Sequence, residues 1–197
     1  MRYEVVLDLG ETPNKCTIAP LEQRPDFVLF RVSRKRENLG PFTVPLLLHH
    51  QGTCLTKIRK AEGSASDLGI GAIDCVWNRL DELISRVTEP LPTFVKIPDG
   101  FETAYPRKSS LNTDPDGGLA TIEAIFVGAA LLGKWDISLF QKYYFGKKFI
   151  ELNQKLFLDL GVTEARDLSS IPDPLKVSRN SRQRKLDRGW RDPKGES

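Results

Sequence analysis

Cysteine and histidine are scarce in this chain, and their positions exclude several kinds of site. The 197 residues contain three cysteines (Cys16, Cys54 and Cys75) and two histidines (His49 and His50). The cysteines are odd in number and form no CxxC pair, so the sequence indicates neither a disulfide framework nor a structural zinc site. The histidines are adjacent, and neighbouring residues of a strand point to opposite faces, which makes them a poor pair of metal ligands. We therefore expect no metal site.

Long apolar runs and several common catalytic motifs are also missing. No run approaches the roughly 20 apolar residues that a membrane-spanning helix needs, and the start, MRYEVVLDLG, has an acidic residue where a signal peptide has its apolar centre. The sequence has no glycine-rich phosphate loop, GxSxG turn or HExxH pair. With 40% hydrophobic and 28% charged residues, the composition is typical of a soluble globular protein, which we expect in the cytoplasm.

Basic residues are concentrated at the C-terminus. The net charge is +3, but residues 176–197 contain eight basic and three acidic residues and so carry +5, which leaves −2 for the rest of the chain. This segment is polar and follows the sequence IPDP, so we predict a disordered tail. Basic arms bind polyanions, and Trp190 can stack on a base, so the tail favours RNA as a partner. The simpler interpretation is a tail that only keeps the protein soluble.

Hydrophobic patterns divide the remaining chain into two regions. Up to residue 92, four apolar runs predict strands (RYEVVLDL, DFVLFRVS, TVPLLLHH and GIGAID), and VWNRLDELISRV has helical periodicity, with a weaker helical signal at Ala65–Leu68. After a proline- and glycine-rich passage, three segments predict helices that each end at glycine (LATIEAIFVGAALLG, DISLFQKYYFG and KKFIELNQKLFLDLG). The last helix is expected to bury one stripe, formed by Phe149, Ile150, Leu152, Leu156, Phe157 and Leu160. We predict an α/β region over residues 1–92, a mainly helical region over 93–175 and the tail over 176–197.

One segment matches the pattern of a calcium-binding loop. Asn112 to Glu123, NTDPDGGLATIE, places oxygen ligands at loop positions one, three and five, glycine at six and glutamate at twelve. The context differs from that of a calcium loop, because Pro115 lies inside it and no amphipathic helix precedes it. The alternative interpretation is a turn whose aspartates cap the following helix.

The stretch GIGAIDCVWNRLDEL raises a second pair of interpretations. A buried strand ends at Asp74, and ligands of α/β sheets bind beside the carboxyl ends of strands. Aspartate is also a common residue at the start of a helix, where its carboxylate accepts hydrogen bonds from free N–H groups. In that second interpretation Asp74 is a helix cap, and Trp77, Leu80, Leu83 and Ile84 are core residues on one helical face.

Six short motifs occur in an order that resembles a known family. They are KCT, an apolar strand with glycine four residues after its leucine, DCVW, LP, LATIEA and FGKKFIELN, spread from Lys15 to Asn153. This order resembles the small-subunit ribosomal RNA aminocarboxypropyltransferases, in which the pieces read KCT, LSPxG, VDCSW, LP, LSTxEA and FxWGxxFxxLN. The resemblance implies a SPOUT-like fold, with a trefoil knot in its N-terminal α/β region and an all-α C-terminal region.

The resemblance also implies a cofactor and roles for five residues. Members bind S-adenosylmethionine and transfer its 3-amino-3-carboxypropyl group to a ring nitrogen of a pyrimidine nucleotide. By motif position, the backbone at Thr17 and at Thr121 corresponds to contacts with the amino acid end of the cofactor, and Leu48 to the adenine pocket. Trp77 corresponds to the tryptophan beside the methyl group and sulfonium, and Asp74 to the acid beside the transfer site.

The implied chemistry is consistent with these residue types. A sulfonium has three carbons open to attack, so the group held in line with the nucleophile decides the product. An indole face attracts the positive sulfur by about 0.5–2 kcal/mol. Asp74 either accepts the proton of the attacked nitrogen or stabilises the sulfonium, and the sequence leaves both roles open.

Three departures from the family pattern leave the RNA and its modified nucleotide open. Val76 replaces a serine, His49 and His50 stand where serine and proline are expected, and residues 96–118 replace an NPVNYG-like loop. The first hypothesis is a ribosomal RNA aminocarboxypropyltransferase, expected to be monomeric, whose tail contacts RNA phosphates. The alternatives are a catalytically silent RNA- or ribosome-binding protein with the same fold and a small calcium-binding module.

Overall fold

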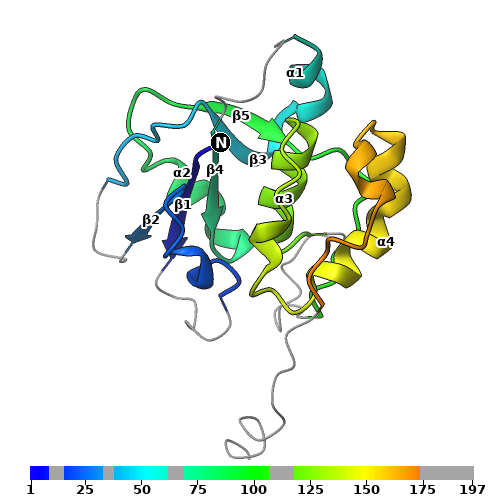
Figure 1. The fold of residues 1–197 in the computed structure, drawn as a ribbon. Helices are drawn as coiled ribbons and strands as arrows, with labels where there is room; N and C mark the ends of the chain where they lie inside the picture. The colour runs from blue at the N-terminus through cyan, green and yellow to red at the C-terminus, as the bar shows by residue number, and fades with distance from the viewer. Residues whose placement is uncertain (9–15, 33–37, 62–68, 107–117, 174–197) are drawn as a thin grey trace, which may run out of the picture.

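The computed structural model describes residues 1–8, 16–32, 38–61, 69–106 and 118–173, in which the chain forms five strands and four α-helices (Figure 1). The strands are β1 (Tyr3–Asp8), β2 (Phe27–Val32), β3 (Leu46–Cys54), β4 (Ile70–Asp74) and β5 (Thr93–Lys96). The α-helices are α1 (Leu55–Ala61), α2 (Leu80–Ile84), α3 (Thr121–Leu131) and α4 (Gly146–Asp159). Short 3₁₀ helices are η1 (Ala19–Leu21), η2 (Trp77–Arg79), η3 (Ile137–Phe140) and η4 (Thr163–Arg166). Within these residues, no helix has the length and apolar character to cross a membrane.

The strands form one parallel sheet in the order β2-β1-β4-β3-β5. β1 pairs with both β2 and β4 and is buried along its whole length. β3 pairs with β4 only at Leu46 and Leu47, whereas β4 continues beside β1 as far as Asp74. The two strands therefore separate before the carboxyl end of β4 is reached. β3 stays with β5, across an irregularity between Leu48 and Thr53.

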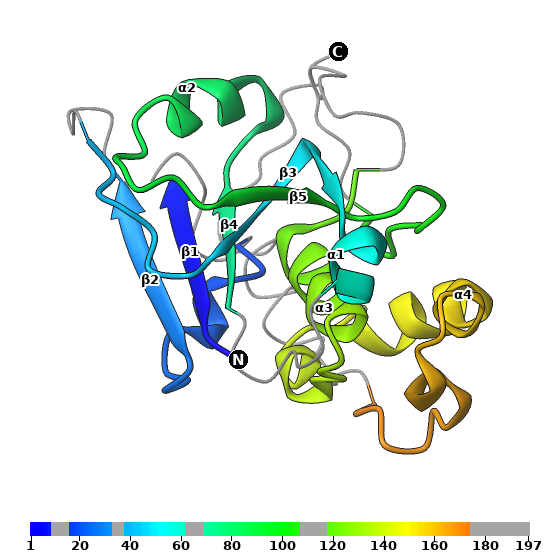
Figure 2. The same cartoon turned by 90° about the horizontal axis from the view of Figure 1, so that it is seen from above.

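Alternating side chains give the sheet two different apolar faces. Tyr3, Val5 and Leu7 of β1 belong to a large core with α3 and α4, whereas Val6 belongs to a smaller core with α2. Figure 2 shows α2 on one side of the sheet, with α3 and α4 on the other. This alternation is the two-residue period of a strand, and it decides which side of the sheet each functional residue faces.

The helix α3 lies between the sheet and the C-terminal helices and is apolar almost all round, as a buried helix is. Gly128 lies against the sheet, because a Cβ atom there would be 3.1 Å from the side chain of Ile70. Phe126 stacks on Phe140, with ring centroids 4.4 Å apart, and lies edge-on to Phe157 of α4. Thr121, the first residue of α3, contacts Asp74, the last residue of β4. Gly128, near the other end of α3, lies beside Ile70, the first residue of β4, so α3 runs antiparallel to β4.

The structure corrects the prediction for DISLFQKYYFG and for part of the last helix. The segment forms only the 3₁₀ turn η3, and its glycine, Gly146, begins α4. Residue 146 packs closely on η3, since a Cβ atom there would lie 2.6 Å from Phe140, and so the position requires glycine. Leu152 is 44% exposed and does not join the predicted buried stripe. Gly133 and Gly161 follow α3 and α4 with positive φ, which confirms those two helix ends.

The four predicted strands and the helical segment after Val76 are confirmed, but two elements were missed. β5 is four residues long and lies between Pro92 and Pro98, so its sequence is typical of a loop. The seven residues of α1 are too few to show a clear helical period. The weaker helical signal at Ala65–Leu68 lies outside the described residues.

Candidate active site

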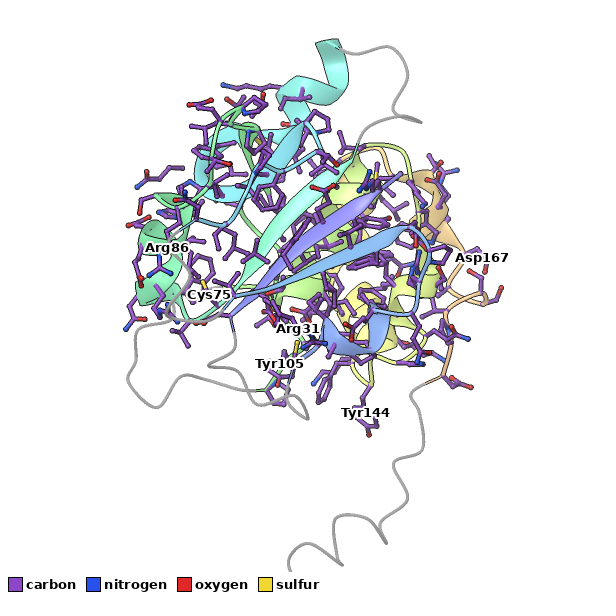
Figure 3. The ribbon with its side chains drawn as sticks, turned by 90° about the vertical axis from the view of Figure 1, so that its left-hand side faces the viewer. Arg31, Cys75, Arg86, Tyr105, Tyr144 and Asp167 are labelled. Atoms are coloured by element: carbon purple, nitrogen blue, oxygen red, sulfur yellow. The ribbon has the colours of Figure 1, made fainter. Side chains whose placement is uncertain are left out.

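Asp74 is the last residue of β4, and its carboxylate joins two distant parts of the chain. The hydroxyl of Thr121 donates to Oδ1 at 2.6 Å, and the thiol of Cys16 donates to Oδ2 at 3.2 Å. Along β4, Ile70 and Ala72 belong to the core beneath α3, and the strand period places Asp74 on the same face. Cys75, the next residue, marks this end of the sheet in Figure 3.

The interpretation of Asp74 as a helix cap is wrong. The residue that precedes η2 is Val76, and the helix has no side-chain capping hydrogen bond. The strand carries Asp74 toward α3 on one face, whereas η2 and α2 pack against the other. The expectation that the residues of this helical face belong to the core is confirmed, since Leu80 and Leu83 are buried and Trp77 and Ile84 pack against their core.

The start of α3 lies beside Asp74. The first N–H groups of a helix have no partner within the helix, and they give this end a partial positive charge. The residue before α3 is Ala120, which has no side chain that could accept hydrogen bonds from those groups. The strand end and the helix start thus place a carboxylate next to a set of backbone donors.

The structure gives Cys16 a polar role. Its side chain is buried, and its sulfur also accepts a hydrogen bond from the backbone N–H of Ala19 at 3.3 Å. Burial, followed by the nearby Asp74 carboxylate, raises the pKa of the Cys16 thiol to about 11. Cys16 therefore stays protonated at neutral pH and acts as a donor that orients Asp74.

We expect Cys16 to resist alkylation in the folded protein. A pKa of about 11 leaves about a thousandth of the thiol as reactive thiolate at pH 8, far less than in an unperturbed cysteine. Treatment with iodoacetamide followed by peptide mass spectrometry should show Cys54 modified well before Cys16, with Cys16 accelerating as the pH approaches 11. In urea the two should react at similar rates. Equal rates in the folded protein would contradict the buried, protonated thiol.

Two other residues that the family resemblance implies, Thr17 and Leu48, are linked to this position less directly. Thr17 follows Cys16 directly and is partly exposed. Leu48 packs on α3, since a Cβ atom on Gly128 would lie 3.6 Å from its side chain. Gly128 is about two helical turns from Thr121. The structure therefore brings Thr121 into direct contact with Asp74 and places Thr17 next to Cys16, the second residue that contacts Asp74. Leu48 packs against α3 about two turns beyond Thr121.

Trp77 packs with the smaller core, on the α2 side of the sheet. Its ring lies edge-on to His50, with centroids 6.3 Å apart, and His50 lies beside His49, with centroids 4.4 Å apart. Both histidines fall in the irregular stretch of β3. Burial lowers the pKa of His49. The departure from serine and proline thus puts the imidazole ring of His50 beside Trp77, with His49 next to His50.

A buried acid also ends the neighbouring strand. Asp8 is the last residue of β1, lies one position beyond the partner of Asp74, and contacts the guanidinium of Arg79. No motif in the sequence includes Asp8, although it is the last residue but one of the run RYEVVLDL, and Asp74 similarly ends the run GIGAID. Two adjacent strands of the sheet therefore end in carboxylates.

Glu123, which belongs both to the calcium-loop pattern and to the LATIEA motif, is a buried carboxylate. Its two oxygens accept hydrogen bonds from the Thr103 hydroxyl at 2.6 Å, the Ala104 N–H at 3.0 Å, the Ala120 N–H at 3.0 Å and the Tyr143 hydroxyl at 2.9 Å. Burial outweighs these four donors and raises the pKa of Glu123. Both oxygens of Glu123 are thus occupied by hydrogen bonds around the start of α3. The other side chains that the calcium-loop pattern offers as ligands lie outside the described residues.

Asn153 fixes the same segment from the other side. Its amide oxygen accepts from the Glu102 N–H and its amide nitrogen donates to the Glu102 carbonyl, both at 2.8 Å. Residues 101–106 are thus held by α4 through Asn153 and by α3 through Glu123. This gives a physical reason for the asparagine in the FGKKFIELN motif.

No protein-family model matches the sequence, and no curated protein matches it either. Among solved structures, the chain is similar to the SAM-dependent rRNA:acp-transferase Tsr3 from Vulcanisaeta distributa. The sequence identity is 23%, the TM-score is 0.57, and 86% of each chain is covered. The chain therefore shares the fold of an aminocarboxypropyltransferase, which is the family that the order of its motifs resembles.

Proposed function

We propose that this protein is an S-adenosylmethionine-dependent transferase that moves the 3-amino-3-carboxypropyl group to a pyrimidine ring nitrogen in structured RNA, with ribosomal RNA as the expected substrate. The observation that carries the proposal is the meeting of Cys16, Asp74 and Thr121 at the carboxyl end of β4. These residues come from three motifs that lie far apart in the sequence. The shared fold with the Tsr3 transferase supports the proposal.

The chemistry of this position fits the amino acid end of the cofactor. That end carries a carboxylate, an ammonium and a sulfonium, and so needs both donors and a negative charge. The start of α3 offers backbone N–H groups, because Ala120 provides no capping side chain. The partly exposed Asp74 offers the carboxylate. Thr17 and Thr121 would hold the amino acid end by their backbone, with Leu48 and Trp77 supplying apolar contacts.

The protein's own contribution to the reaction is orientation and proton transfer. Bound S-adenosylmethionine supplies a carbon made reactive by the neighbouring positive sulfur. Thr121 and Cys16 hold both oxygens of Asp74, which fixes the direction in which its carboxylate faces. As the ring nitrogen bonds to that carbon and the carbon–sulfur bond breaks, the nitrogen loses its proton, and Asp74 accepts it.

The proposal includes the knotted topology and a contribution of the tail to RNA binding. The knot belongs to the fold that the motifs resemble, and the separation of β3 from β4 leaves the carboxyl end of β4 beside α3. The tail, residues 176–197, lies outside the described residues. Its charge of +5 would contact phosphates without regard to sequence.

Calorimetry with S-adenosylmethionine and S-adenosylhomocysteine tests the proposal. The full-length protein should bind both, and Trp77→Ala should weaken binding by about 2–4 kcal/mol, because it removes a large apolar contact and a cation–π partner. Leu91→Ala is the matched control, because Leu91 is an exposed apolar residue and its loss should leave affinity unchanged.

Measurements of melting temperature and of RNA binding complete this test. The melting temperature of each variant without cofactor separates lost binding from lost folding, since Trp77 also packs against the smaller core. Absence of heat and of any cofactor-dependent rise in melting temperature for the wild-type protein would reject the transferase. Salt-sensitive RNA binding by the same sample would then favour the catalytically silent RNA-binding protein.

A further inference from the structure

Lysines flank three consecutive aromatic residues in the short stretch KYYFGKK, which runs from just after η3 into the first turn of α4. Tyr144 is 48% exposed, which is unusual for a large aromatic side chain. Its ring lies edge-on to the half-buried ring of Phe145, with centroids 4.9 Å apart. The exposed ring of Tyr144 thus packs against the ring of Phe145.

Tyr105 adds a third ring from another part of the chain. Its centroid is 5.9 Å from that of Phe145 and 6.5 Å from that of Tyr143. Tyr143 is buried, and its hydroxyl is fixed to Glu123. We name Tyr105, Tyr144 and Phe145 the aromatic platform. It is backed by the core, so little side-chain freedom would be lost when a ligand stacks on it.

The aromatic platform lies at the start of α3, where the candidate active site also lies. Glu123 binds the segment that carries Tyr105 and the residue before Tyr144. Thr121, two residues earlier in the same helical turn, binds Asp74. Figure 3 shows Tyr144 projecting outward at the lower edge of the view, with Tyr105 between it and Cys75.

Two lysines flank the aromatic platform. Lys142 and Lys148 are exposed, and within the described part of the chain neither forms an ion pair. Lys147, between them, is held by Asp173 at 2.7 Å. Planar apolar faces next to available positive charges complement single-stranded RNA, which offers unstacked bases along a chain of phosphates.

We propose that the aromatic platform stacks on unpaired bases of an RNA, while Lys142 and Lys148 bind its phosphates. The inference rests on the proposed function, because it identifies the surface that holds nucleotides next to the modified one. A paired base has both faces covered by its neighbours, so the platform selects single-stranded segments. The substrate is then a loop or another unpaired region of a structured RNA.

Fluorescence anisotropy with the full-length protein tests the proposal, using a labelled mixed-sequence 12-nucleotide RNA as a single strand and as a duplex. Tyr144→Ala should weaken single-strand binding about 5- to 150-fold, which corresponds to the loss of one stacked base, and should leave duplex binding unchanged. Tyr144→Phe keeps the ring and should bind as the wild type does. Leu152→Ala removes a similarly exposed apolar side chain from α4 and should have no effect.

The lysines provide a second reading. Lys142→Gln and Lys148→Gln should each lower the salt slope of binding by about 0.7–0.9, because one phosphate contact is lost. Equal weakening of single-strand and duplex binding by Tyr144→Ala, no weakening, or no binding of the 12-mer by the wild type would overturn the inference. So would a change in molar mass on Tyr144→Ala without a change in RNA affinity, which would assign the surface to contacts between copies.

Calorimetry with S-adenosylmethionine on the same variants separates this inference from the proposed function. Cofactor binding with RNA affinity that is insensitive to Tyr144→Ala would leave the transferase standing and reject the aromatic platform. Absence of cofactor binding, together with a Tyr144-dependent preference for single strands, would reject the transferase and retain the platform.

Discussion

Replacing Asp74 with asparagine is expected to lower the rate of transfer to RNA by about 10²- to 10⁴-fold. Asparagine keeps the shape and one acceptor oxygen, so the hydrogen bond from Thr121 can persist. It carries no charge and accepts no proton, so the step assigned to Asp74 is lost. The fold and the affinity for S-adenosylmethionine should change little by comparison.

Mass spectrometry of RNA treated with each purified variant and S-adenosylmethionine measures this effect. Asp99→Asn is the matched control, because Asp99 is an aspartate on the exposed surface after β5 and its amide variant should retain full activity. Calorimetry and thermal melting show whether Asp74→Asn still binds cofactor and folds. Equal product from the wild type and Asp74→Asn would remove Asp74 from the reaction and leave it as a tie between β4 and α3.

Replacing Glu123 with alanine is expected to lower the free energy of unfolding by about 3–5 kcal/mol. The change leaves four donors without their acceptor: two backbone N–H groups, of Ala104 and Ala120, and the hydroxyls of Thr103 and Tyr143. Buried polar groups that lose their partners cost about 1–3 kcal/mol each, and part of that cost is relieved when water enters. Urea unfolding followed by circular dichroism measures the difference.

Two variants calibrate the result for Glu123. Tyr143→Phe removes one donor and keeps the ring, so it should cost only about 1 kcal/mol. Glu151→Ala removes an exposed glutamate from α4 and should change stability by less than about 0.5 kcal/mol. A loss for Glu123→Ala no larger than that of Glu151→Ala would contradict the buried network.

The strands β1 to β4 were predictable because each has a local signal. β1, β2 and β4 are short apolar runs that a few residues define, and the sequence patterns place them correctly. β5 lacks such a signal, because its role depends on pairing with β3 through contacts to Leu46 and Leu47. A four-residue strand between prolines gains its stability from its neighbours, which no short window of sequence contains.

The site was predictable only through its motifs. The strand pattern placed Asp74 at a carboxyl end, but its contact with Cys16 spans 58 positions and its contact with Thr121 spans 47. Such contacts depend on how the chain crosses the sheet, which residue patterns do not determine. The motif order named Thr17 and Thr121 as neighbours of the site, whereas the donor role of Cys16 emerged only from the structure.

The anchoring of residues 101–106 has a consequence for how this sequence can change. Asn153 and Glu123 hold that segment by its backbone, and Glu123 also holds Ala120 just before α3. The two ends of the intervening stretch are therefore fixed independently of its own sequence. We expect substitutions in that stretch to leave the hydrogen bond from Thr121 to Asp74 in place, because both ends of the stretch are held by side chains that lie outside it.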